Sequence, residues 1–160
     1  MRKPMNRQST SLAPADIGGR LVSAHQTAVV SDHAVVGSAA EWRGKSSEFP
    51  AVLDEGVIVR EFARVHAGTY RPTIVGARTW IMAGAHVGHD TRIGADCDIA
   101  PNAVIGGCVT IGNRVKVGMG ATIRPHVVVG DGARIGSGAA VVRDIPAGET
   151  WAGVPARRIK

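Results

Sequence analysis

Aromatic residues are scarce in this chain of 160 residues, which holds three Trp, two Phe and one Tyr against 21 Gly. Bulky aromatic rings normally supply much of the buried area of a globular core. The apolar fraction is nevertheless an ordinary 44%. The core of this protein must therefore be filled by small and branched residues, chiefly Val, Ile and Ala.

Long hydrophobic runs are also missing. No apolar stretch approaches the roughly 18 residues that indicate a membrane-spanning helix, and the first 16 residues lack the continuous hydrophobic segment of a signal peptide. Cysteine is limited to Cys97 and Cys108, without a CxxC spacing, which suits a reducing compartment and does not indicate a disulfide scaffold. We expect a cytoplasmic protein that does not insert into membranes.

Acidic residues are outnumbered, with 13 Asp and Glu against 19 Lys and Arg, so the formal net charge is +6. A solvated basic surface explains this excess as well as an anionic partner such as a phosphorylated cofactor or nucleotide. Nucleic acid is not expected as a partner, because the arginines are dispersed and no aromatic stacking motif accompanies them.

A period of six residues organises the chain from Val75 onward. Four residues after each repeated aliphatic position comes a small or β-branched residue, and glycine often follows the aliphatic residue directly. Neither an α-helix nor a simple alternating strand has this period. The repeated aliphatic positions are Val75, Ile81, Val87, Ile93, Ile99, Ile105, Ile111, Val117, Ile123, Val129, Ile135 and Val141.

A coil of three short strands joined by tight corners does have a period of six for each wall. The aliphatic residue then fills the interior, the small residue packs beside it, and glycine is expected to supply the backbone angles of the corner. Residues 18 apart lie above one another, with strands spaced by about 4.8 Å. The sequence therefore predicts an all-β fold, a single-stranded parallel β-helix.

Interruptions of the period suggest the domain limits. Residues 1–16 are expected to form a disordered tail, and residues 17–146 the β-helix domain. Residues 41–52 are out of pattern and predict an irregular loop leaving the coil. Four extra residues near the sequence YRPT (70–73) also break the phase. Residues 147–160 are expected to form a short C-terminal cap.

The histidines can be placed on this coil. His89 and Asp90 are expected to face outward, His86 to lie at a corner, and His66 to lie about one coil earlier. Gly107 follows His89 by 18 residues and should lie directly above it. An exposed histidine is most often a solvated surface group. A neutral imidazole with a neighbouring carboxylate and a backbone N–H above it also suits general-base catalysis of acyl transfer.

A zinc site is the third interpretation, since three histidines with an open fourth position form a known catalytic arrangement. The zinc-dependent γ-class carbonic anhydrases share such a coil and resemble the stretch TIGNRVKVGMGA (110–121). Their ligand pattern includes two histidines five residues apart, whereas His86 and His89 are three apart. No metal is therefore expected.

From residue 59 to residue 144 the chain resembles the UDP-N-acetylglucosamine O-acyltransferases of the hexapeptide acyltransferase superfamily. The sequence IVREFARVHAGT (58–69) is similar to that family's I-R-E-x-x-T-I-H-R-G-T, and MAGAHVGHD (82–90) is similar to its N-A-H-I-A-H-D. The resemblance implies a left-handed coil and a homotrimer with active sites between neighbouring subunits.

The same resemblance implies roles for individual residues. His89 falls on the general base, followed by Asp90, and Gly107 falls on the glycine of the oxyanion site. His66 and His86 fall on histidines that line the substrate pocket. There are departures: Cys108 and Arg124 stand where the family has histidines, the family's loop lysine has no counterpart at the same place, and we expect no counterpart of its C-terminal helical domain.

The C-terminal sequence DIPAGETWAGVPARRIK (144–160) instead resembles acetyl-CoA-dependent sugar acetyltransferases. This implies transfer of an acetyl or other short acyl group from acyl-CoA to an amine or hydroxyl of a sugar or sugar nucleotide. The alternatives are a γ-carbonic anhydrase-like metalloenzyme and a non-catalytic β-helix binding module. Candidate substrate-binding residues are His66, His86 and Arg124, and candidate cofactor-binding residues are Met119, Arg143, Arg157 and Arg158.

Overall fold

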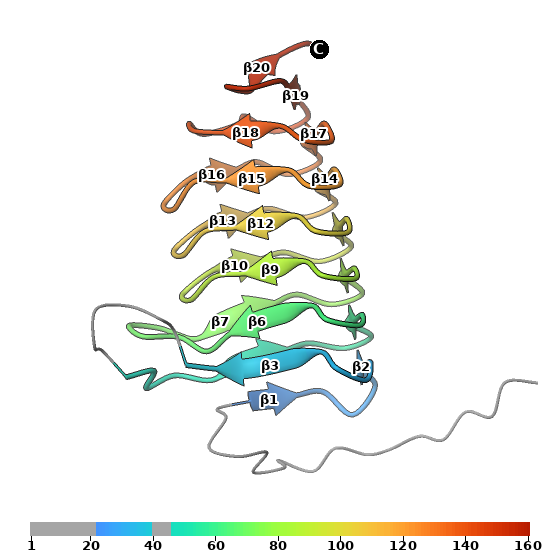
Figure 1. Cartoon of the computed structure of the whole chain (residues 1–160), viewed down its shortest axis with the longest axis vertical. Helices are drawn as coiled ribbons and strands as arrows, with labels where there is room; N and C mark the ends of the chain where they lie inside the picture. The colour runs from blue at the N-terminus through green and yellow to red at the C-terminus, as the bar shows by residue number, and fades with distance from the viewer. Residues whose placement is uncertain (1–21, 40–45) are drawn as a thin grey trace, which may run out of the picture.

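A computed structural model describes residues 22–39 and 46–160 of the chain (Figure 1). The predicted tail at 1–16 lies outside these residues, as does part of the predicted loop. Within the described ranges the regular structure consists of 20 short strands and no helix. No helix that could cross a membrane occurs in these ranges.

The strands, in chain order, have the following bounds. They are β1 (Val22–Ala24), β2 (Val29–Val30), β3 (Val35–Ser38), β4 (Ala51–Leu53), β5 (Ile58–Val59), β6 (Arg64–His66), β7 (Thr73–Val75), β8 (Trp80–Ile81), β9 (His86–Val87), β10 (Arg92–Ile93), β11 (Asp98–Ile99), β12 (Val104–Ile105), β13 (Thr110–Ile111), β14 (Lys116–Val117), β15 (Thr122–Ile123), β16 (Val128–Val129), β17 (Arg134–Ile135), β18 (Ala140–Val141), β19 (Thr150–Ala152) and β20 (Arg157–Arg158).

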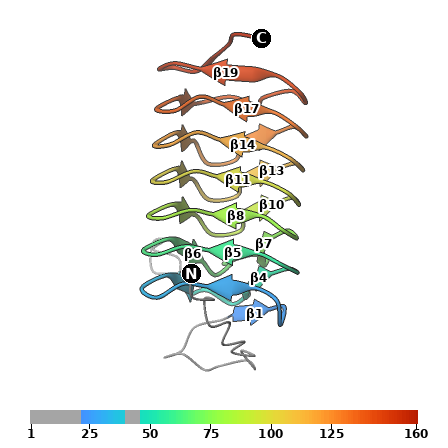
Figure 2. The ribbon, with the colours of Figure 1, turned by 90° about the vertical axis from the view of Figure 1, so that its right-hand side faces the viewer.

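The strands form three sheets in which, apart from β19 and β20, neighbouring strands are three apart in chain order. Sheet A runs from β1 to β16, sheet B from β2 to β20, and sheet C from β3 to β18. Figure 2 shows the strands of sheet B stacked one above another. Ile93 pairs with Ile111, and Val87 with Ile105, so the parallel register advances by 18 residues per coil. The predicted β-helix is confirmed.

The interior is filled as the period predicts. All twelve repeated aliphatic positions are at most 4% exposed, and the small residues four positions later are equally buried. These side chains form one continuous hydrophobic core along the stack. The scarcity of aromatic residues follows, because each layer of the coil holds only three aliphatic and three small residues.

The corners are built differently from our expectation. The left-handed backbone falls on the third residue after the aliphatic position, for example at Asp90 (φ 59°) and Asn102 (φ 58°). The glycine directly after the aliphatic residue has another role. A Cβ added at Gly76 would lie 2.6 Å from the carbonyl carbon of Gly94 in the next coil. Glycine is required there because stacked backbones approach too closely for a side chain.

The loop predicted at residues 41–52 ends earlier than expected. Ala51 and Val52 belong to β4, and Ala51 is fully buried. Strand β4 pairs with both β1 and β7, so its residues continue the coil. Before it, Phe49 forms an isolated antiparallel bridge with Gly68.

Parallel stacking extends beyond residue 146, where we expected the cap to begin. Strand β19 pairs in parallel with β17, and Trp151 lies opposite Ile135 in a coil shortened by two residues. Trp151 is only 8% exposed and covers the end of the core. Strand β20 then turns back and pairs with β19 in the antiparallel sense.

Gly76→Ala tests the close-approach interpretation of these glycines. The added methyl group would collide with the Gly94–Ala95 peptide group of the next coil, so the substitution should lower the free energy of unfolding by about 1–3 kcal/mol, the usual cost of overpacking. Denaturant unfolding followed by circular dichroism measures this loss. The matched control is Gly120→Asn, at φ 63° with nothing within 4 Å of an added Cβ. Equal costs for the two variants would contradict the interpretation.

Candidate active site

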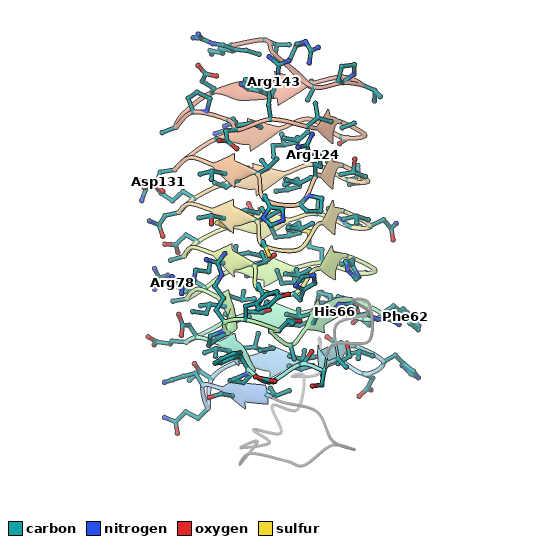
Figure 3. All side chains as sticks on the ribbon, turned by 90° about the vertical axis from the view of Figure 1, so that its left-hand side faces the viewer. Phe62, His66, Arg78, Arg124, Asp131 and Arg143 are labelled. Carbon is teal, nitrogen blue, oxygen red and sulfur yellow. The ribbon has the colours of Figure 1, made fainter. Side chains whose placement is uncertain are left out.

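The predicted catalytic residues gather where strands of sheet C lead into strands of sheet A, and we call this the C–A edge. The chain turns here after β9 and β12, at residues 88–91 and 106–109. The extra residues found in the sequence lie at this edge too, between the end of β6 at His66 and the start of β7 at Thr73. Figure 3 faces this side of the stack.

Asp90 anchors the inserted loop. Its Oδ1 atom accepts three consecutive backbone N–H groups, from Thr69 (2.9 Å), Tyr70 (2.8 Å) and Arg71 (2.9 Å). The Arg71 Nε donates to the backbone carbonyl of Asp90 at 2.9 Å. Asp90 is only 1% exposed. Asp90 therefore points away from the coil interior, as we expected, but it is shielded from solvent because the inserted loop folds over it.

The second carboxylate oxygen of Asp90 holds the imidazole of His89. Asp90 Oδ2 lies 2.6 Å from His89 Nδ1, and the His89 side chain is 18% exposed. Burial alone would raise the pKa of Asp90, but the hydrogen bonds from His89 and from the loop N–H groups outweigh it and keep the pKa below its ordinary value. Asp90 is therefore ionised at neutral pH and favours the His89 tautomer that carries its proton on Nδ1.

Gly107 lies directly against the other side of the His89 ring. A Cβ at Gly107 would lie 2.6 Å from His89 Nε2, so only glycine fits at this position. The backbone also connects the two coils, since the Cys108 N–H donates to the His89 carbonyl at 2.8 Å. Within the described part of the chain, the Gly107 N–H donates no hydrogen bond. The predicted proximity of His89 and Gly107 is present in the structure.

His66 and His86 meet at the neighbouring strands β6 and β9. Their rings pack edge to face with centroids 4.7 Å apart. His86 is a strand residue of β9, so the corner position that we expected for it is wrong. His66 is only 7% exposed. Burial, aided by the nearby charges of His86, Arg64 and His89, lowers the pKa of His66 to about 4.

A pocket of about 280 Å³ opens beside His89 at this edge. None of Tyr70, Pro125 and His126 is among the site residues predicted from the sequence, and Cys108 stands there only as a departure from the family. The 18-residue spacing could have found three of them, because it stacks Pro125 above Gly107, and Cys108 and His126 above Asp90. The pocket is lined by Tyr70, His89, Gly107, Cys108, Pro125 and His126.

The candidate cofactor-binding residues and the candidate substrate-binding residue Arg124 are not brought together in the single chain. Arg124 and Arg143 lie above His66 on the side of the stack seen in Figure 3. Met119 is 59% exposed on a different edge, between β14 and β15. The last two candidates, Arg157 and Arg158, form β20, and Arg158 is paired with Glu149 at 3.3 Å.

One group of side chains in this part of the described structure could bind a metal ion. It is not the group of three histidines considered from the sequence. His89, Asp90 and Cys108 place their ligand atoms within 4.8 Å of one another. Both cysteines are free, as expected. Burial raises the pKa of the Cys108 thiol, and the negative charge of Asp90 adds to this effect.

The stacked coils with this repeat identify the family. The family model "Bacterial transferase hexapeptide (six repeats)" matches residues 72–107 and 108–143. Residues 72–143 of the chain therefore carry the hexapeptide repeat of this family. The UDP-3-O-acylglucosamine N-acyltransferase of Caulobacter sp. (strain K31) is 36% identical over 109 residues, covering 68% of this chain and 32% of the relative.

Other relatives match shorter segments. The acyl-[acyl-carrier-protein]–UDP-N-acetylglucosamine O-acyltransferase of Burkholderia mallei (strain SAVP1) is 43% identical over 47 residues, covering 28% of this chain. The chain spans 18% of the length of that relative.

Two solved structures share the fold. The acetyltransferase domain of PglB from Neisseria gonorrhoeae FA1090, in complex with acetyl coenzyme A, is 28% identical with a TM-score of 0.52, covering 88% of this chain and 58% of that one. The UDP-N-acetylglucosamine acyltransferase of Francisella novicida has a TM-score of 0.76 at 23% identity, over 82% and 50% of the two chains. At that identity the second likeness concerns the fold alone.

The low pKa of His66 predicts how stability changes with pH. The unfolded chain binds this proton near the ordinary pKa of 6.5 and the folded chain only near 4. The stabilisation from neutral His66 is therefore complete above pH 6.5 and is lost as the pH falls towards 4. His66→Gln should flatten this part of the stability curve by up to about 1.4 kcal/mol per pH unit. Urea unfolding between pH 4.5 and 7 measures the slope, and parallel curves for wild type and variant would contradict the prediction.

Proposed function

We propose that this protein is an acyltransferase that moves an acetyl or other short acyl group from acyl-CoA to an amine or hydroxyl of a sugar or sugar nucleotide. The observation that carries the proposal is the arrangement around His89. Its Nδ1 is held by the buried Asp90 carboxylate, while its Nε2 lies against Gly107 in an open pocket. General-base catalysis needs an oriented imidazole of this kind beside the reacting atoms.

The proposed reaction uses both nitrogen atoms of His89. Nε2 takes the proton of the acceptor hydroxyl or amine while the acceptor oxygen or nitrogen bonds to the thioester carbonyl carbon. The Gly107 N–H donates to the oxyanion that develops on the carbonyl oxygen. The carbon–sulfur bond then breaks, and the imidazolium returns the proton to the leaving CoA thiolate. Asp90 stabilises the imidazolium between these steps and holds the ring in place.

Short acyl-CoA donors are supported by the PglB acetyltransferase domain, which binds acetyl coenzyme A. The pocket here is small, and exposed Arg124 lies beside its lining residue Pro125, where it can meet a phosphate group. Arg143 continues this basic surface, and Met119, Arg157 and Arg158 remain candidates for contacts to the rest of the donor.

Sugar-nucleotide acceptors are supported by the Caulobacter and Burkholderia relatives, whose names specify UDP-linked glucosamine derivatives. The small pocket on one chain leaves most of such a substrate outside it. We therefore propose a homotrimer, in which a neighbouring copy covers the C–A edge and completes the binding site. A cytoplasmic location fits the two free cysteines.

Replacing the base tests the proposal directly. His89→Ala should lower kcat/KM by about 10²–10⁴, the usual contribution of general-base catalysis. Thiol release from acetyl-CoA is measured with a panel of amino-sugar nucleotides, and circular dichroism confirms the fold. His25→Ala is the matched control, since His25 is exposed between β1 and β2, far from the pocket. Full activity of His89→Ala would show that another group is the base.

Asp90 acts through His89 in this proposal, so the effects of the two substitutions on the rate should not be additive. Asp90→Asn is expected to lower kcat strongly, because an amide cannot stabilise the imidazolium. In the double variant with His89→Ala, the rate should be no lower than with His89→Ala alone, because no imidazole remains to be oriented. A further large loss in the double variant would indicate an independent role for Asp90, through the loop that it anchors.

A further inference from the structure

Three different ligand types surround the proposed base. The His89 imidazole, the Asp90 carboxylate and the Cys108 thiol offer one nitrogen, one oxygen and one sulfur atom, all within 4.8 Å of one another. Asp90 Oδ2 is at the centre of the group, 2.6 Å from His89 Nδ1 and 4.0 Å from Cys108 Sγ. These are the three side-chain types that zinc prefers.

The surroundings also suit a bound cation. Asp90 is almost fully buried and its position is fixed by the three N–H groups of the inserted loop, so one ligand is already held rigidly. His89 and Cys108 both line the pocket, which gives an ion access from solvent. His126 lines the same pocket but lies one coil above Cys108 and two coils above Asp90, outside the group of close ligand atoms, so the fourth position is left to water.

The distances require only small side-chain movements. Ligand atoms bound at about 2.0–2.3 Å from a tetrahedral zinc ion are separated by roughly 3.3–3.8 Å from each other. The present separations fall on both sides of that range. The proposed site requires the His89 and Cys108 side chains to rotate to reach this range, while the buried Asp90 stays in place.

We propose that His89, Asp90 and Cys108 form a zinc-binding site that inhibits the enzyme by occupying its base. Coordination through Nε2 takes the lone pair that would accept the proton of the acceptor. Coordination through Nδ1 forces the proton onto Nε2, with the same result. Zinc binding and general-base catalysis are therefore mutually exclusive at His89. The inhibition rests on the proposed function, whereas the binding does not.

Zinc chloride titrated into the full chain, with neither donor nor acceptor present, tests the binding. Calorimetry should give one ion per chain, and Co²⁺ in place of zinc should produce a thiolate-to-metal charge-transfer band. Cys108→Ser should remove the band and weaken zinc binding by more than about tenfold, because a lost ligand costs at least as much as a lost outer-sphere partner.

Cys97→Ala is the matched control. Its sulfur is buried in the interior of the coil, 3.1 Å from the Gly112 carbonyl, so this variant should keep both the band and the zinc affinity. The proposal is overturned if the wild type binds no zinc, if Cys108→Ser binds it as tightly as the wild type, or if Cys97→Ala loses the site.

The inhibition is tested separately from the activity itself. In the thiol-release assay, stoichiometric zinc should abolish turnover and a chelator should restore it. Turnover that persists with zinc bound would overturn the inhibitory role. Absence of turnover in metal-free protein that nevertheless binds zinc would contradict the proposed acyl transfer and leave the metal site standing.

Discussion

The close stacking of one coil on the next is the constraint on which this structure depends. Neighbouring coils share a continuous ladder of parallel backbone hydrogen bonds, and their corners approach so closely that a Cβ at Gly76 or Gly88 would lie 2.6 Å from backbone atoms above it. This spacing limits the size of the side chain that fits at the interior and close-approach positions of each repeat. Residues 18 apart consequently become direct neighbours, and the site is assembled from such neighbours.

The same constraint explains why so much of the fold could be predicted from the sequence. An interior aliphatic position every six residues leaves only one arrangement of walls and layers, and its positions could be counted along the chain from Val75 to Val141. The adjacency of His89 and Gly107 follows from this arithmetic. The glycines were misinterpreted because the sequence shows that a side chain is missing, but not whether space or backbone angle requires it.

The features that could not be predicted lie where the period breaks. The extra residues between His66 and Thr73 have no counterpart in the repeat, so the sequence could not show that they fold back over Asp90. That contact changes an outward-facing carboxylate into a buried one. It also brings Tyr70 to the pocket, although Tyr70 lies in the insertion and has no equivalent position in the six-residue repeat. A local insertion thus buries and fixes the Asp90 carboxylate that orients His89, and it supplies part of the pocket wall.

The corner residues that stack above Asp90 at 18-residue spacing carry reactive side chains on a backbone of fixed geometry. Asp90, Cys108 and His126 all have left-handed backbone angles, between 59° and 66° in φ, as the corners of this coil require. Glycine or asparagine would meet that requirement with less strain, and both occur at corners elsewhere in the stack. Backbone preference therefore does not account for a cysteine and a histidine here. Their side chains line the pocket at His89, where any group that binds the imidazole competes with proton transfer. The identity of the residue at position 108 thus bears on whether His89 is available as a base, even if that residue takes no part in the reaction.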